Sequence, residues 1–163
     1  MARSDFESGV TAGDRIELRI WLRLLTCCNM LESRVRQRLQ RDFATTLPRF
    51  DVLAQLYRES PLSMSELSRR TMVSNGNITG LVARLAQEGL IAKKPARDRR
   101  VQMVELTQDG RAQFEDQARK HRAWIGEMMG ALSTEDMRTL HVLLARVKAS
   151  IIASDQERLE AAE

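Results

Sequence analysis

The stretch Ser63–Thr107, SMSELSRRTMVSNGNITGLVARLAQEGLIAKKPARDRRVQMVELT, decides how this chain folds. It opens with a capping box, in which the Ser63 hydroxyl accepts from the amide of Glu66 and the Glu66 side chain reaches back to the amide of Ser63. The box predicts a short helix that ends near Met72. A second helix is predicted to start at Ser74, a residue type that caps helices, and to stop at Gly89.

The second helix has apolar residues at Ile78, Leu81, Val82 and Leu85, the i, i+3, i+4 and i+7 spacing of one buried face. Only a short turn separates it from the first helix, so the pair is typical of a helix-turn-helix. Two short apolar runs follow, at 90–95 and 101–106, and they bracket the charged residues 96–100. This pattern predicts a β-hairpin with a charged tip.

The segments on either side of this stretch have the periodicity of long amphipathic helices. No Gly or Pro interrupts residues 14–47, and a helix of about 30 residues there would be ~45 Å long. Its apolar stripe is Ile16, Ile20, Leu24, Cys28, Leu31, Val35, Leu39 and Phe43. A small domain does not need a rod of that length, so part of the stripe is expected to pack against another chain. A shorter helix is predicted from Pro48 to about residue 59.

Two further helices are predicted at the C-terminal side. Thr107 is placed to cap a helix over 108–130, and the sequence Ser133–Asp136 is a second capping-box candidate. The last helix has an apolar stripe at Met137, Leu140, Leu144, Val147 and Ile151, close to the spacing of helices that pack lengthwise. Residues 154–163 are polar and are expected to fray. The predicted fold is mainly α with a small β-hairpin wing: a winged helix-turn-helix plus a helical dimerisation region.

The length and composition narrow the classes of protein that fit. A chain of 163 residues with 43% hydrophobic and 29% charged residues suits one globular domain, expected to span 1–163. The formal net charge is +4, which favours an anionic partner. Neither a signal peptide nor a stretch of membrane-spanning length is recognisable, so we expect a cytoplasmic protein without a membrane partner.

The outward face of the second helix is suited to the major groove of DNA. It carries Asn75, Gly76, Asn77, Thr79 and Gly80. Asparagine can donate to and accept from the edge of adenine, and threonine offers a hydroxyl and a methyl group for thymine. Each glycine costs ~1 kcal/mol of helix stability relative to alanine, a cost that is understandable if the backbone approaches something closely.

The hairpin tip adds a cluster of positive charge. Arg97, Arg99 and Arg100 follow Lys93 and Lys94, and Asp98 is the single acidic residue among them. Projecting arginines suit phosphate contacts or insertion into the minor groove. Double-stranded DNA is therefore the expected partner.

This pattern resembles the MarR family of bacterial winged-helix regulators. The resemblance rests on Leu67-Ser68, the run Ser74–Leu85, Glu88–Ile91, the wing Asp98–Arg100, Val104–Thr107 and Asp109-Gly110, and with the flanking helices it covers about residues 14–153. It implies dimerisation helices at 14–46 and 108–153, a winged helix-turn-helix at 48–107, and a homodimer that binds a pseudo-palindromic operator, by default as a repressor. Such dimers place one helix in each of two major grooves ~34–36 Å apart.

The resemblance also assigns roles to individual residues. It implies that Ser74, Asn75, Asn77 and Thr79 face bases or nearby phosphates and that Arg84 reaches a phosphate. In the wing, Arg100 would enter the minor groove, oriented by Asp98, with Arg97 and Arg99 beside it.

A small-molecule effector is implied as well. The string Ser74–Leu81 resembles regulators of aromatic-acid catabolism, some of which respond to CoA thioesters. The expected effector is an aromatic carboxylate or an acyl-CoA thioester, and its pocket is expected among Arg19, Trp21, Arg23, Asn29 and Phe50.

Other functions remain open at this point. Cys27-Cys28 would serve a thiol-redox sensor of the same fold, although buried helical cysteines are the expectation. A helical dimer scaffold that does not bind DNA would leave the basic wing and the helix glycines unexplained. His121 and His141 are the only histidines and do not form a metal-binding pair. The sequence predicts no catalytic residue, cofactor or metal site.

Overall fold

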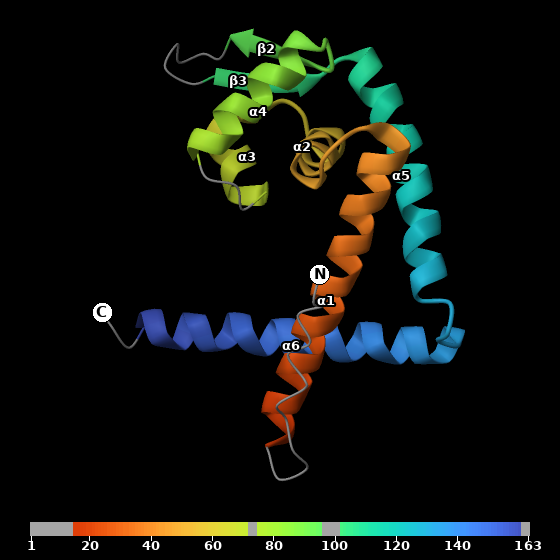
Figure 1. The fold of residues 1–163 in the computed structure, drawn as a ribbon. Helices are drawn as coiled ribbons and strands as arrows, with labels where there is room; N and C mark the ends of the chain where they lie inside the picture. The colour runs from red at the N-terminus through yellow and green to blue at the C-terminus, as the bar shows by residue number, and fades with distance from the viewer. Residues whose placement is uncertain (1–14, 72–74, 96–101, 161–163) are drawn as a thin grey trace. The chain divides into compact units, whose positions relative to one another are not determined.

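The computed structural model describes residues 15–71, 75–95 and 102–160. It forms two compact units, Met1–Trp124 and Ile125–Glu163, whose boundary falls within the long helix α5, and each unit is described by itself. The elements in chain order are α1 Ile16–Phe43, α2 Leu47–Arg58, β1 Leu62–Ser63, α3 Met64–Thr71, α4 Asn75–Gln87, β2 Ile91–Pro95, β3 Gln102–Leu106, α5 Gln108–Met128 and α6 Thr134–Glu160. The prediction of a mainly α protein with one small hairpin is confirmed (Figure 1).

Three of the predicted helix starts have hydrogen-bonded caps. The capping box at α3 is present, since the Glu66 amide donates to Ser63 Oγ at 3.3 Å and the Ser63 amide donates to Glu66 Oε2 at 3.0 Å. Thr107 caps α5 by accepting from the Gly110 amide at 3.0 Å. Ser133 and Asp136 form the same reciprocal pair at α6, each bond 3.1 Å long.

The hairpin belongs to a small antiparallel sheet with the strand order β1-β3-β2. β2 pairs with β3 from Ile91↔Leu106 to Pro95↔Gln102. The edge strand β1 pairs Leu62 with Val104 on β3, and the sequence analysis did not predict this strand. The sheet thereby joins the residue before α3 to the wing.

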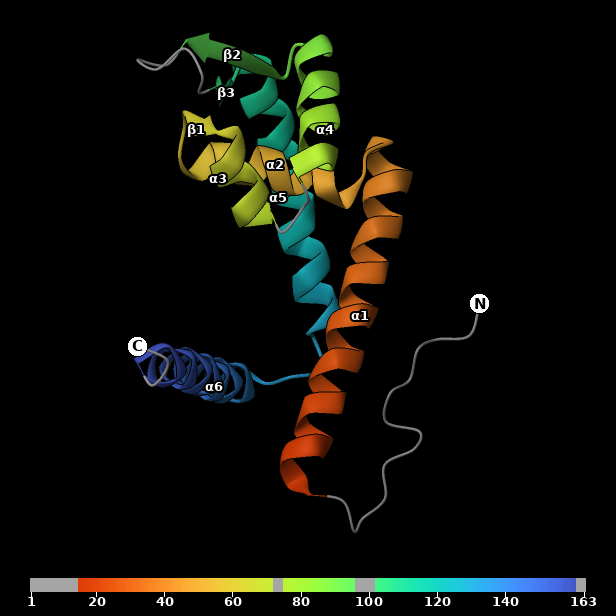
Figure 2. The ribbon, with the colours of Figure 1, turned by 90° about the vertical axis from the view of Figure 1, so that its left-hand side faces the viewer.

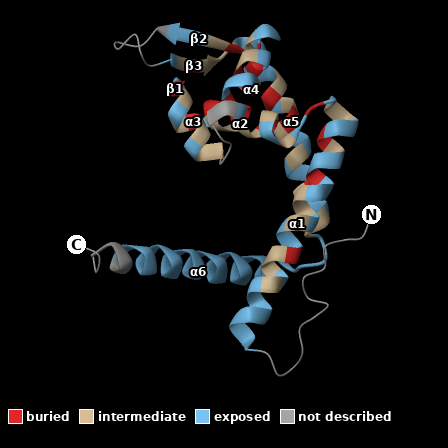
Figure 3. Ribbon diagram, turned by 60° about the vertical axis from the view of Figure 1, so that its left-hand side comes forward, coloured by how far each residue is buried: buried red, intermediate tan, exposed pale blue. Residues whose placement is uncertain are grey.

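The core of the first unit lies where α2, α3 and α4 pack beside the sheet (Figures 1 and 2). The fully buried apolar side chains come from every one of these elements, as the buried residues in Figure 3 show. They are Val52, Leu53, Leu56, Leu62, Leu67, Ile78, Val82, Leu85 and Val104, and Leu39 near the end of α1 is fully buried as well. The predicted inward face of α4 is thus confirmed, and this core fixes which face of α4 remains outside.

α5 packs on α1 and α2 through aromatic rings. The Phe50 ring of α2 lies 5.4 Å from that of Phe114 and 5.0 Å from that of His121, measured between centroids. Near the end of α1, the Phe43 and Trp124 rings are 6.2 Å apart. Burial lowers the pKa of His121, which keeps the imidazole neutral at pH 7.

Two expectations for the helices were wrong. Residues 154–160 continue α6, which ends at Glu160, although they were expected to fray. Their polar composition had given no apolar stripe from which a helix could be predicted. Cys27 and Cys28 are both exposed rather than buried, because the spacing of residues along a helix does not show whether a neighbour covers them. In the described part of the chain, no helix is both long enough and apolar enough to cross a membrane.

Candidate nucleic-acid interface

The two faces of α4 differ sharply in burial. Ile78, Val82 and Leu85 on the inner face are at most 1% exposed. The outer face presents Asn77, Thr79, Gly80 and Arg84, and all four are exposed. The structure therefore places Asn77, Thr79 and Arg84, which were predicted to contact DNA, on the accessible side of the helix together with Gly80.

Gly80 has no internal reason to be glycine. A Cβ built on Gly80 meets no atom within 4 Å, and the residue lies in regular helix. Alanine there would stabilise the helix by ~1 kcal/mol, so the fold alone favours alanine. The packing of the described residues therefore does not require glycine at position 80.

An ion pair connects the C-terminal end of α4 to α2. Arg49 on α2 donates to both carboxylate oxygens of Glu88, and the bond from Nη1 to Oε1 is 2.8 Å long. This hydrogen bonding lowers the pKa of Glu88, which keeps its carboxylate charged. Gly89 then reverses the chain with φ +74°, a conformation that favours glycine, and the Leu90 amide donates to Leu85 O at 2.9 Å. These contacts hold the exposed face of α4 in a fixed direction.

Helix α3 supports α4 and supplies a positive charge of its own. Its first turn is occupied by the Glu66 carboxylate, whose pKa is lowered by hydrogen bonds from the Ser63 amide and hydroxyl. Arg70 pairs with Glu59 at 2.6 Å and so ties α3 to the end of α2. The neighbouring Arg69 is exposed and has no ion-pair partner among the described residues.

Arg69 is an exposed arginine beside the helix-turn-helix that the sequence analysis did not select. In a helix-turn-helix the first helix crosses the DNA backbone, where an exposed arginine meets phosphate. The Arg69-Arg70 pair was visible in the sequence, but the periodicity did not show which of the two is held by Glu59.

The hairpin contributes exposed lysines at its base. Lys93 and Lys94 are exposed on β2, and Lys94 Nζ lies 2.8 Å from Glu105 Oε2 on β3. The predicted wing residues Arg97, Asp98, Arg99 and Arg100 lie outside the described residues, as does Ser74. Asn75 begins α4, but its side chain is not described.

The five residues expected to form an effector pocket are not brought together within one chain. Arg19, Trp21 and Arg23 are exposed on α1, and Trp21 is 57% exposed. Phe50 is 7% exposed and packs against the α5 rings. Asp51 next to it has a pKa raised by burial and then by the charge of Glu32.

The geometry defines a class of protein before any comparison is made. A helix-turn-helix with a polar outer face, followed by an antiparallel hairpin with lysines at its base, is a winged helix-turn-helix of the kind that binds double-stranded DNA. No group of three metal-binding side chains occurs among the residues that the structure describes.

Comparison with known proteins identifies the family. Residues 45–101 match the MarR family. The transcriptional activatory protein BadR of Rhodopseudomonas palustris is 36% identical over 152 residues, which cover 88% of this chain and 86% of BadR. The chain belongs to the MarR family. It is a DNA-binding transcriptional regulator and not an enzyme.

Solved structures agree with this assignment. A MarR family regulator from Silicibacter pomeroyi is 28% identical with a TM-score of 0.72, covering 87% of this chain and 99% of that one. Apo MarR from E. coli is 25% identical with a TM-score of 0.68, covering 77% and 93% respectively. A MarR family regulator from Streptomyces coelicolor, solved in complex with DNA, shares the fold with a TM-score of 0.71 at 21% identity, covering 88% and 92%.

Proposed function

We propose that this regulator binds a pseudo-palindromic operator as a homodimer, represses transcription in the cytoplasm, and is released by a small effector. The observation that carries the DNA part is the exposed polar face of α4 over a fully buried apolar face, with no internal neighbour at Gly80. Ser74, Asn75, Asn77 and Thr79 would read bases or nearby phosphates, and Arg84 would reach a phosphate. Arg97, Asp98, Arg99 and Arg100 would form the minor-groove wing.

The homodimer is supported by apolar side chains that the single chain leaves exposed. On α1, Ile16 is 58% and Ile20 is 50% exposed. On α6, Leu143 is 49% and Ile151 is 57% exposed. Burial of such residues stabilises by ~1.5–3 kcal/mol each, so a second copy is a favourable cover for both faces.

The effector is proposed to be an aromatic carboxylate or its CoA thioester, bound near Arg19, Trp21, Arg23, Asn29 and Phe50. Support comes from Gln117 on α5, one turn from the Phe114 and His121 rings that touch Phe50. Gln117 is fully buried, and neither its amide nitrogen nor its amide oxygen has a partner among the described residues. Such a group costs ~1–3 kcal/mol, and a polar ligand that enters beside Phe50 would satisfy it.

The exposed thiols of Cys27 and Cys28 favour a second candidate, a regulator of the same fold that senses oxidants. The two candidates differ in what releases the operator. Peroxide would release it for a thiol sensor, whereas an aromatic acid or thioester would release it for a ligand sensor.

An operator titration tests the proposal. Binding of the wild type, Arg100→Ala and Asn77→Ala to the upstream region of the gene is measured over a range of salt concentrations, with light scattering of the complex. Arg100→Ala should weaken binding and reduce the salt slope by ~1 for each lost phosphate contact. Asn77→Ala should change the preference among single-base operator variants. Arg122→Ala, an exposed position on α5, is the matched control and should leave both unchanged.

The same titration addresses the remaining parts. A monomer on a single half-site would contradict the homodimer, and an unchanged slope for Arg100→Ala would contradict the wing assignment. Repeating it with benzoyl-CoA, hydroxycinnamoyl-CoA, their free acids or peroxide identifies the releasing agent. Because BadR is named an activatory protein, a promoter fusion is needed for the sign of regulation, and activation would overturn the repressor proposal.

A further inference from the structure

We propose that Arg69 on α3 and Lys93 on β2 bind phosphates of the operator, one from each of two elements that flank α4. α4 packs against both α3 and β2. Neither residue belongs to the positions proposed above for base reading or for the tip of the wing. The inference rests on the proposed placement of α4 in the major groove, and it adds contacts to the DNA backbone beside that helix.

Each of these two residues stands next to a second cation that a carboxylate holds. Arg70 Nη1 lies 2.6 Å from Glu59 Oε2, and Lys94 Nζ lies 2.8 Å from Glu105 Oε2. Arg69 and Lys93 are exposed and have no ion-pair partner in the part of the chain that the structure describes. The carboxylates therefore offset one charge of each neighbouring pair and leave the other for an external anion.

The position of Arg69 on α3 turns its side chain away from the core. The inner face of the helix is marked by Leu67, which is 0% exposed. Two residues along an α-helix correspond to a rotation of ~200°, so Arg69 lies on the opposite face. Glu66, one turn before it, is occupied by the capping box, since its carboxylate accepts from the Ser63 amide at 3.0 Å and from the Ser63 hydroxyl at 2.7 Å.

Arg69 also lies at the end of α3 that leads to the DNA-facing helix. α3 ends at Thr71 and α4 begins at Asn75. In a helix-turn-helix the first helix crosses the DNA backbone, and the start of the second helix contacts the base edges. An exposed arginine in the last turn of the first helix is therefore close to the strand whose bases the second helix reads.

The alternation of side chains along β2 distinguishes Lys93 from Lys94. Lys93 is paired with Val104 in the register of the sheet, and directly opposite residues point to the same face. Val104 is 0% exposed and belongs to the core formed with α2, α3 and α4. Lys93 thus projects from the face of the hairpin on which the helices pack, whereas Lys94 projects from the other face, where Glu105 holds it.

Phosphate contacts have a signature that separates them from base contacts. Contacts to the backbone position a protein on the duplex without reading its sequence. Each neutralised phosphate releases counterions, so the slope of log affinity against log salt concentration changes by ~0.9 for each contact. A homodimer presents each residue twice, and loss of either side chain should therefore reduce this salt slope by ~1.8.

Two matched pairs of variants of the full-length protein test the proposal, with fluorescence anisotropy of a labelled operator over a range of salt concentrations. Arg69→Gln and Lys93→Gln should each reduce the salt slope by ~1.8 and weaken binding about tenfold. Arg70→Gln and Lys94→Gln should keep the slope of the wild type, because each loses a carboxylate partner rather than a phosphate. Arg69→Lys should retain most of the slope, because it keeps the charge.

Two further measurements distinguish a phosphate contact from a role in the fold. The order of preference among single-base operator variants should be the same for Arg69→Gln, Lys93→Gln and the wild type. The unfolding midpoint of Arg69→Gln should equal that of the wild type, because the arginine has no partner among the described residues. Any loss of stability should fall instead on Arg70→Gln, which unties α3 from the end of α2.

Three results would overturn the proposal. The first is an unchanged salt slope for Arg69→Gln or for Lys93→Gln. The second is an equal loss of slope within a matched pair, which would mean a diffuse positive field. The third is an altered base preference, which would mean that the residue reads sequence or moves α4.

The same titration separates this inference from the proposed function. A wild type that does not bind the operator would overturn both. A wild type that binds, with Asn77→Ala changing base preference as proposed but no difference within the matched pairs, would overturn only the contacts assigned to Arg69 and Lys93.

Discussion

Two glycines, Gly80 on α4 and Gly110 on α5, differ in what surrounds them. On the outer face of α4, a Cβ at Gly80 would meet no atom within 4 Å. At the start of α5, a Cβ at Gly110 would lie 1.9 Å from Leu90 O. The first position is constrained by nothing inside the molecule, and the second by the packing of α5 against the corner between α4 and β2. The surroundings of a glycine therefore show whether packing requires it, as at Gly110, or leaves the position open, as at Gly80.

The corner at Gly110 is tight because three hydrogen bonds meet there. The Thr107 amide donates to Leu90 O at 3.1 Å, and the Thr107 hydroxyl donates to Gly89 O at 2.7 Å. The Gly110 amide in turn donates to Thr107 Oγ1 at 3.0 Å. The first turn of α5 is thereby held on the backbone that leaves α4, so the end of the DNA-facing helix and the start of α5 share one rigid joint.

The largest expected effect comes from filling that joint. Gly110→Ala should lower the free energy of unfolding by ~3 kcal/mol or more, because the new methyl group overlaps the Leu90 carbonyl, which accepts a hydrogen bond from the Thr107 amide. Urea unfolding at a fixed protein concentration measures it. Gly126→Ala on the same helix is the control, since a Cβ there meets no atom within 4 Å. Equal stability of the two variants would show that α5 can move away from Leu90.

A smaller effect with two opposite signs is expected at Gly80. Gly80→Ala should raise the free energy of unfolding by up to ~1 kcal/mol, because alanine favours the helix and finds open space. The same change should weaken operator binding about tenfold, ~1.4 kcal/mol, because the methyl group separates the α4 backbone from the DNA. Stability and operator affinity measured on the same preparation decide the matter. A variant that is more stable and binds equally well would remove the partner explanation for this glycine.

The sequence predicted the features that depend on residues close together along the chain. The boxes at Ser63 and Ser133, the cap at Thr107 and the apolar face of α4 each involve residues within a few positions of one another. Such interactions are encoded in spacing, and the structure has them where the spacing placed them.

What the sequence did not predict depends on residues that are far apart along the chain. β1 has only two residues, too few for an alternating pattern, and forms because it meets β3 some forty residues later. The stripe of α1 showed which residues share a face but not that Cys27 and Cys28 would be exposed. Four arginines occur between residues 34 and 41, and their spacing does not show that Arg36 and Arg41 line an open recess where α1 meets α2.

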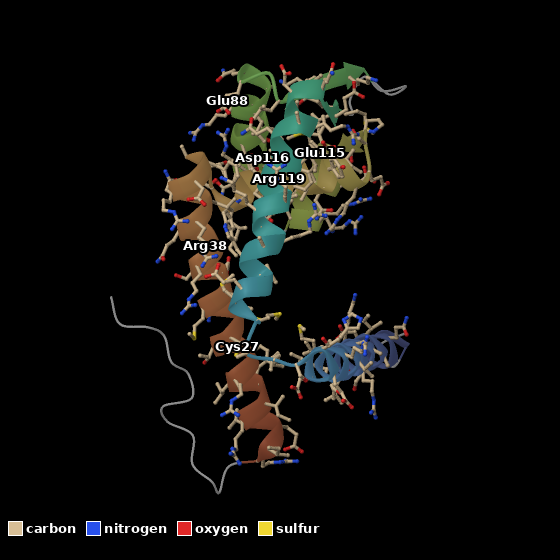
Figure 4. All side chains as sticks on the ribbon, turned by 90° about the vertical axis from the view of Figure 1, so that its right-hand side faces the viewer. Cys27, Arg38, Glu88, Glu115, Asp116 and Arg119 are labelled. Carbon is tan, nitrogen blue, oxygen red and sulfur yellow. The ribbon has the colours of Figure 1, made fainter. Side chains whose placement is uncertain are left out.

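The side chains along α5 show the same limit. Arg38 on α1 lies over the Trp124 ring at 5.9 Å, and Tyr57 donates to Glu115 at 3.0 Å. Figure 4 labels Arg38 on α1 and Glu115 on α5. Arg111 stacks on the Tyr57 ring at 4.8 Å. None of these pairs has a helical spacing, so the periodicity of the sequence does not predict them. They connect α5 to α1 and α2.

The smallest expected effect on stability concerns the Arg49–Glu88 ion pair at the end of α4. Glu88→Gln removes the charge that Arg49 holds, and it should lower the free energy of unfolding by ~0.5 kcal/mol, since Glu88 is partly exposed and water screens the pair. The pKa of Glu88 is lowered in the folded chain, so the contribution is complete above the unfolded pKa and is lost as the pH falls through the lowered value. Stability measured at pH 7 and near pH 3 should therefore differ between wild type and variant at pH 7 and converge in acid. Base preference should remain unchanged, because Glu88 lies at the inner, fastened end of the helix. A variant that keeps its stability but changes operator preference would contradict this expectation. It would mean that the Arg49–Glu88 pair orients the exposed face of α4 without stabilising the fold.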